Sequence, residues 1–106
     1  MAQFLRACGF EVEHRRFRVG RHEIDLVVRC RTLVVFVEVK TRHSVTCGTP
    51  LESINARRCR RLAQAALVWC ARHGRRSDTY RFDLLAMTPD GLGGLAVVHV
   101  ADAWRL

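Results

Sequence analysis

The apolar residues follow a strand-like pattern over most of the chain and a helix-like pattern over one long segment. Five segments are rich in β-branched and other apolar residues and are bounded by glycine or polar turns, which predicts β-strands. These segments are residues 10–19, 22–30, 32–41, 79–88 and 95–101. The turn around Arg31 is so short that the second and third strands should form an antiparallel hairpin.

Residues 49–74 carry the signals of a long helix. Thr49 suits the N-cap, Pro50 suits the first helical position, and Glu52 completes a capping box. Gly74 stands where a helix commonly ends in a left-handed residue. One face of this helix carries an apolar stripe that should pack on the sheet. The stripe consists of Ile54, Leu62, Ala66 and Trp69.

A short helix should precede the strands, because residues 2–8 resemble the last turns of a helix that ends at Gly9. The order is then helix, three strands, long helix and two strands. This order predicts an α/β fold with a mixed sheet. A chain of 106 residues has the size of one domain, residues 1–106.

The charge balance favours a polyanionic partner. The net charge is +8, and 17 of the 18 basic residues are arginine. Nucleic acid is the common partner of so basic a short chain. A basic surface without a specific role, or an arginine bias set by genome composition, is the alternative.

Targeting and cysteine usage point to a cytoplasmic protein without a membrane partner. No apolar run approaches the roughly 20 residues that cross a bilayer, and the first residues lack the apolar core of a secretory signal. The five cysteines are odd in number and include no Cys-x-x-Cys pair. Reduced thiols are therefore expected, rather than a disulfide framework or a zinc ribbon.

Acidic residues interrupt the second and third strands. Strand side chains alternate faces, so Glu23 shares a face with Asp25, and Glu38 shares a face with Lys40. The hairpin register places Asp25 opposite residue 37 or 38, so that Asp25 and Glu38 can meet. Two carboxylates about 5 Å apart repel by roughly 3 kcal/mol at an effective dielectric of 20. A divalent cation such as Mg²⁺ or Mn²⁺ would remove this repulsion, with the Val39 carbonyl as a third ligand.

The same register makes a prediction about packing. Ile24, Leu26, Val37 and Val39 should all point to the face opposite the charged residues. A register shifted by one residue would separate the two acids.

Lys40 is the only lysine of the chain. Arginine is permanently charged, whereas a lysine ammonium can exchange a proton when it is desolvated or placed beside positive charge. A lysine two residues after an acid can orient an attacking water or stabilise the charge that develops at a phosphate. The alternative is a hairpin with ordinary charges on its solvent face, which the spacing alone leaves open.

Four stretches together resemble a known family. They are EIDLVV (23–28), VFVEVKTR (35–42), TCGTPLESINARRCRRL (46–62) and RFDLLAM (81–87). The chain is similar to the UPF0102 (YraN) family of bacterial predicted endonucleases. That family resembles a branch of the PD-(D/E)xK restriction-endonuclease-like superfamily, close to archaeal Holliday junction resolvases.

The resemblance implies an α-β-β-β-α-β core around a mixed sheet flanked by helices. It also implies that Asp25, Glu38 and Lys40 are the motif acids and lysine, and that Glu23 belongs to the family's Gly-Glu-Ile-Asp signature. Two other positions differ from the family pattern. His22 stands in place of the glycine, and Cys47 stands in place of an aromatic residue. Arg58 stands where a lysine is usual. Members of the family usually carry a longer first helix. The first helix of this chain is therefore expected to be truncated.

Other candidates follow from residue type. Four arginines are expected to contact DNA phosphates, with ordinary solvated charge as the alternative. They are Arg42, Arg57, Arg58 and Arg61. Asp83 should accept a hydrogen bond or salt bridge from Arg81 or Arg58 and have a structural role. Trp69 should lie in the core, and Trp104 either anchors the C-terminus or forms part of a homodimer surface. The histidines His22, His43 and His99 are expected to be non-catalytic.

Two functions agree with these features. The first is a Mg²⁺-dependent endonuclease that hydrolyses phosphodiester bonds of DNA, with branched DNA as the substrate that the resemblance implies. The second is a basic nucleic-acid-binding module that keeps the nuclease fold without turnover. Metal-dependent stabilisation would distinguish the two.

Overall fold

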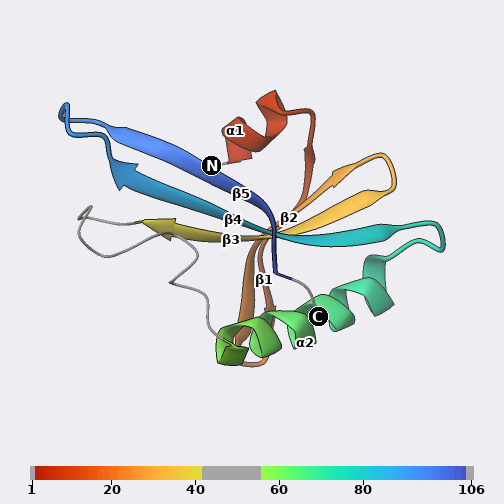
Figure 1. Cartoon of the computed structure of the whole chain (residues 1–106). Helices are drawn as coiled ribbons and strands as arrows, with labels where there is room; N and C mark the ends of the chain where they lie inside the picture. Colours follow the sequence, from red (N-terminus) through yellow and green to blue (C-terminus); the bar gives the residue numbers. More distant parts are fainter. Residues whose placement is uncertain (1, 42–55, 105–106) are drawn as a thin grey trace.

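The computed structural model describes residues 2–41 and 56–104. It contains two helices and five strands in the predicted order (Figure 1). The elements are α1 (Ala2–Ala7), β1 (Glu11–Val19), β2 (His22–Cys30), β3 (Leu33–Thr41), α2 (Ala56–His73), β4 (Thr79–Pro89) and β5 (Leu95–Trp104). Within the described ranges, no helix is both long and apolar enough to cross a membrane.

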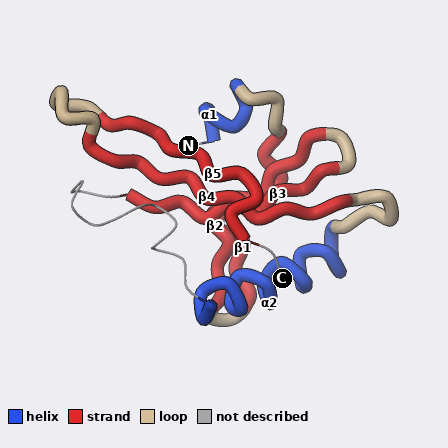
Figure 2. The backbone as a smooth tube through the Cα atoms, in the orientation of Figure 1, coloured by secondary structure: helices blue, strands red, loops and turns tan. Residues whose placement is uncertain are grey.

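The strands form one mixed sheet in the order β1-β2-β3-β4-β5. Neighbouring strands are antiparallel except β3 and β4, which are parallel. A parallel pair needs a crossover connection, and α2 lies in that connection. The α/β class and the antiparallel β2–β3 hairpin are therefore confirmed. Figures 1 and 2 show α1 and α2 on opposite sides of the sheet.

Two apolar clusters hold the layers together. The larger cluster lies between the sheet and α2 and includes Phe36, Leu62 and Trp69. The smaller cluster contains Leu5 of α1 and side chains from the other face of the sheet. The stripe on α2 is confirmed for Leu62, Ala66 and Trp69, each less than a tenth exposed. Thr49, Pro50, Glu52 and Ile54 lie outside the described residues.

The predicted packing of β2 is wrong at one position. Leu26, Val37 and Val39 pack in the α1 cluster, as a shared face requires, but Ile24 packs in the α2 cluster. The facing residue of β1 explains the break. Phe17 pairs with Ile24 and Arg15 pairs with Leu26, so Arg16 lies between them with a φ of 51°. A left-handed φ departs from the extended conformation of a strand, and the β1–β2 turn lies beside α2 (Figure 1).

Two glycines end the helices for different reasons. Gly9 has a φ of 94°, and the Phe10 amide bonds back to the Leu5 carbonyl, as predicted for the end of α1. Gly74 follows α2 but does not have the predicted positive φ. A Cβ at Gly74 would lie 2.5 Å from the Cys70 carbonyl oxygen and 2.6 Å from the Tyr80 hydroxyl. Glycine is therefore needed here for space and not for conformation.

We expect Gly74→Ala to destabilise the protein, because the added methyl group meets the backbone of α2. Overpacking of this kind costs about 1–3 kcal/mol, and each kcal/mol lowers the Tm of a small domain by roughly 4–8 °C. Thermal unfolding followed by circular dichroism measures the change. Ser77→Ala, at an exposed position of the same loop, is the control and should leave Tm unchanged. Equal Tm values for both variants would contradict the close approach.

Candidate active site

The acidic residues lie where β2 separates from β3. Leu26 and Val37 form the last pair at this end of the ladder. If the ladder continued, Val39 would lie opposite Ile24. The Val39 amide instead donates to Oδ2 of Asp25 at 2.8 Å. The Asp25 carboxylate thus takes the place of a backbone acceptor and is held against β3, as the hairpin register predicted.

Glu38 is a buried carboxylate with only one of its oxygens satisfied. Its side chain is 1% exposed. Oε1 accepts a hydrogen bond from Nη2 of Arg58 and lies 3.5 Å from Nζ of Lys40. Oε2 is buried and has no hydrogen-bond partner among the described residues. A buried oxygen left in this state is costly, which marks a place for a further ligand.

Burial raises the pKa of Glu38, and the nearby charge of Asp25 raises it further. Arg58 and Lys40 act in the opposite direction, because a positive charge favours the ionised carboxylate. The two acids therefore repel each other inside the protein, and two cations from different elements offset part of that repulsion.

The cations lie on the solvent side of the acids. The side chain of Lys40 is 25% exposed and that of Arg58 is 42% exposed. Lys40 shares a strand face with Glu38, and Arg58 reaches the same carboxylate from the first turn of α2. An anion that approaches the buried Glu38 carboxylate therefore meets two positive groups first.

The other predicted site residues lie elsewhere or on the rim. Glu23 is bound by two arginines of β1, with its oxygens 3.5 Å from Nε of Arg16 and 3.0 Å from Nε of Arg18. Arg57 and Arg61 are exposed on α2. The predicted phosphate contact Arg42, like His43 and Cys47, lies outside the described residues.

Arg58 is the residue whose place the sequence did not reveal. It was expected to contact phosphate or Asp83, and it pairs with Glu38. Its position in the family pattern, where a lysine is usual, was the only available signal. A pairing between a helix and a strand that are distant in sequence has no local signature.

Asp83 has a structural role, as predicted. Its carboxylate is fully buried and accepts two bonds from Arg81, at 2.7 and 2.8 Å. It also bonds to Nε2 of His99 at 2.7 Å and to the amide of Asp102 at 2.9 Å. Asp83 therefore ties the C-terminal half of β5 to β4, and these contacts engage both of its oxygens.

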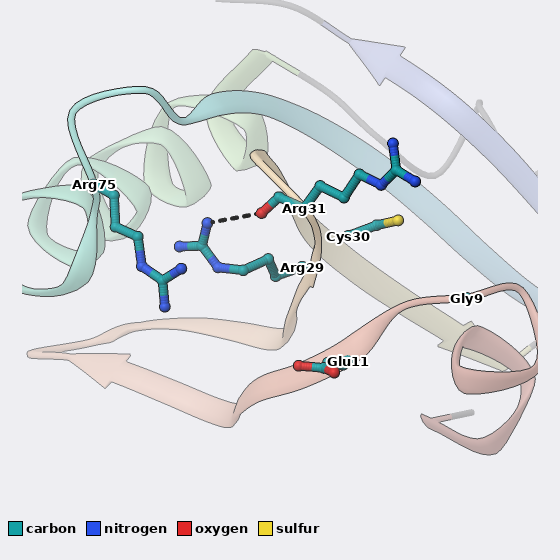
Figure 3. Close-up of a pocket in the computed structure, with 6 residues that line it drawn as sticks. All are labelled: Gly9, Glu11, Arg29, Cys30, Arg31 and Arg75. Carbon is teal, nitrogen blue, oxygen red and sulfur yellow. Dashed lines mark hydrogen bonds between the residues drawn. The ribbon is translucent and has the colours of Figure 1, made fainter.

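A pocket of about 410 Å³ lies at the other end of the β2–β3 hairpin. Figure 3 shows Arg29 in this pocket, with a bond from its guanidinium to the Arg31 carbonyl. Arg29 also binds Asp78 through two bonds, at 2.6 and 3.0 Å, and Glu13 at 2.7 Å. The bonds from Arg29 lower the pKa of Asp78 to about 2. The deepest cation of this pocket is thus already neutralised, and its role is structural.

The acid pair suits a hard divalent cation that takes part of its ligands from water or substrate. The described residues contain no group of three histidine, cysteine or acidic side chains that could hold a metal by themselves. Mg²⁺ is commonly bound by one or two carboxylates, with waters and phosphate oxygens completing the shell. The unsatisfied Oε2 of Glu38, beside Asp25, fits this requirement.

We expect the stability of Glu38→Gln relative to wild type to increase with pH in the presence of EDTA. The pKa of Glu38 is raised on folding, so its contribution to stability is complete below pH 4 and is lost as pH rises through the folded pKa. Glutamine does not titrate. The Tm difference between variant and wild type should therefore grow in favour of the variant as the pH rises from 4.

Glu11→Gln is the matched control, because Glu11 is exposed on β1. Comparison with Glu11→Gln at each pH removes any effect of the exchange that does not depend on burial. Tm differences of the two variants that change alike with pH would show that the buried carboxylate is not destabilised by its surroundings.

The chain is similar to proteins of one family over most of its length. The family model for "Uncharacterised protein family UPF0102" matches residues 1–87. A UPF0102 protein of Symbiobacterium thermophilum is 40% identical over 104 residues, which cover 98% of this chain and 88% of the relative. UPF0102 proteins of Chloroherpeton thalassium and Frankia casuarinae are 37% and 35% identical over 87 and 103 residues. These matches cover 82% and 97% of this chain, and 67% and 87% of the relatives.

The matched residues include the acid pair, the lysine and Arg58. They also include every element from α1 to α2. The expected relationship is thereby confirmed, and the chain belongs to the UPF0102 family.

Proposed function

We propose that the protein is a metal-dependent endonuclease that hydrolyses phosphodiester bonds of DNA. The observation that carries the proposal is the pairing of half-buried Asp25 with buried Glu38, with Oε2 of Glu38 unsatisfied and Lys40 on the solvent side of Glu38. A net charge of +8 favours a polyanionic substrate.

In this proposal Asp25 and Glu38 hold Mg²⁺ or Mn²⁺, and the Val39 carbonyl is a further candidate ligand. When bound, such a cation polarises a phosphate and lowers the pKa of a coordinated water. The amide of Val39 fixes the Asp25 carboxylate, and Arg58 fixes Oε1 of Glu38, so that both acids are oriented before a substrate arrives. Such preorganisation is the main contribution that a protein makes to this chemistry.

Lys40 acts on the reacting groups. Its ammonium can donate a hydrogen bond to the attacking water or to a non-bridging phosphate oxygen, where negative charge develops. Water attacks phosphorus and releases one proton to solvent, the bond from phosphorus to the leaving oxygen breaks, and the leaving oxygen takes up one proton from solvent. Glu23 lies two residues before Asp25 on β2, but it is bound by Arg16 and Arg18. Glu23 is proposed as an auxiliary metal ligand or base, and either role requires its release from that pair.

Four arginines are proposed to position the DNA. Arg57 and Arg61 are exposed on α2, and Arg58 lies beside the acids. Arg42 follows the strand that carries Lys40. Contacts from these groups to phosphates would fix the duplex without reading its sequence. A preference for branched DNA rests on the resemblance to Holliday junction resolvases.

A second candidate is a DNA-binding module without turnover. The pairing of Arg58 with Glu38 favours it, because a guanidinium then offsets the buried charge in place of a metal. Such a module would bind DNA in EDTA with a strong dependence on salt, and divalent cations would not change its Tm.

We expect Mn²⁺ or Mg²⁺ to raise the Tm of the wild-type protein. A ligand at ten times its Kd stabilises a folded protein by about 1.4 kcal/mol, which corresponds to several degrees in a small domain. Asp25→Asn should lose the metal-dependent rise, whereas Glu11→Gln should retain it. A wild-type Tm that is the same in Mn²⁺ and in EDTA would favour the binding module.

We expect Lys40→Ala to lose most of the nicking activity of the wild-type protein. The assay uses linear, flapped and four-way DNA in Mn²⁺. Loss of a positioned proton donor lowers rates by about 10²–10⁴-fold. Lys40→Arg keeps the charge and tests whether a primary amine is required, and Arg76→Ala, at an exposed position far from the acids in sequence, is the control. Equal nicking by wild type and Lys40→Ala would assign the activity to another site or to a contaminant.

A further inference from the structure

The two edges of the sheet differ in how they are protected. β1 carries charged side chains on an exposed strand and has a register shift between Val12 and His14. The charged residues are Glu11, Glu13, Arg15, Arg16 and Arg18. Charges and irregularities of this kind prevent another strand from adding to an edge. β1 is therefore a protected edge.

β5, the other edge strand, lacks this protection. Residues 82–104 contain no lysine or arginine, although the whole chain has 18 basic residues. Leu95 is 54% exposed, Val97 is 40% exposed and Val98 is 36% exposed. Val97 and Val98 are neighbours and point to opposite faces, so apolar side chains are exposed on both sides of this edge. The β4–β5 hairpin projects from the body of the protein (Figure 1).

The part of β5 that can accept a partner is residues 95–100. Beyond it, Asp102 has a φ of 52° and its amide is bound to Asp83 of β4. The strand is therefore bent at its C-terminal end and tied to the sheet. The preceding residues keep a regular register with β4, from Val100 opposite Leu84 to Leu95 opposite Pro89.

The charge distribution indicates what the partner is. A nucleic acid would bind near cations, and residues 82–104 have none. Two copies of a chain of net charge +8 repel each other over most of their surface. The segment that contains β5 carries three aspartates as its only charged residues, and Arg81 neutralises one of them, Asp83. Contact through β5 therefore brings together the least basic parts of two copies.

Strand geometry also favours a second copy. An antiparallel pair of identical strands is related by a two-fold axis, so each copy offers the same edge to the other. Pairing centred on Val97 or Val98 would oppose apolar side chains across the new pair. We propose that the protein forms a two-fold homodimer through antiparallel pairing of β5 with β5 of a second copy.

The dimer has a continuous sheet, in which five interstrand steps separate the two β3 strands. At about 4.8 Å a step, these strands lie roughly 24 Å apart. A two-fold axis perpendicular to the sheet places both α2 helices, and hence both acid pairs, on the same side. The role of this arrangement for one DNA molecule rests on the proposed function, whereas the dimer itself does not.

The test is the mass of the full chain in solution, measured by sedimentation equilibrium over a range of concentrations. The chain has a mass of 12.1 kDa, so the wild type should approach twice this value. Val97→Lys and Val98→Lys each place a charge on the proposed edge. Each variant should raise the dissociation constant of the dimer by at least about tenfold. Leu67→Lys adds the same charge at a position of α2 that is 65% exposed and should leave the dimer intact.

Amide hydrogen exchange provides a second measurement. Exchange within residues 95–100 should slow as the wild type dimerises, because edge amides gain acceptors. The highest concentration measured is about 100 μM. A wild-type protein whose mass is still 12.1 kDa at that concentration would overturn the proposal. A dimer that both β5 variants retain would also overturn it. Lys40→Ala should remain dimeric, so loss of nicking and loss of the dimer are separate results.

Discussion

The buried carboxylate of Glu38 is the constraint on which the site depends. Its pKa is raised by burial and by Asp25, and three groups hold the pair in place. The Val39 amide binds Asp25, while Arg58 and Lys40 offset the charge of Glu38. Because Arg58 belongs to α2, the packing of this helix on the sheet and the charge balance of the site are coupled.

The hairpin that carries the acids could be predicted because its signals are local. A short turn and two β-branched segments determine the pairing of β2 with β3, and that pairing determines which residues meet. The position of Ile24 could not be predicted, because it depends on the left-handed conformation of Arg16. Arginine has no preference for a positive φ, so the residue type at position 16 does not predict this irregularity.

Long-range contacts were harder to predict than strands. The contact of Arg81 with Asp83 follows from two residues on one strand face. The contact of His99 with the same carboxylate requires the register of β4 and β5, which contains a shift between Phe82 and Leu84. Gly74 shows the same limit, because part of its need for space comes from Tyr80 on the next strand. A glycine that is needed for a positive φ and a glycine that is needed for space cannot be distinguished in the sequence.

The family match ends at residue 87, within β4, and β5 follows it. Asp25, Glu38, Lys40 and Arg58 all lie before that point. β4 separates the outer edge of the sheet from the acids, so a substitution on β5 can alter subunit contact without touching Asp25, Glu38 or Lys40.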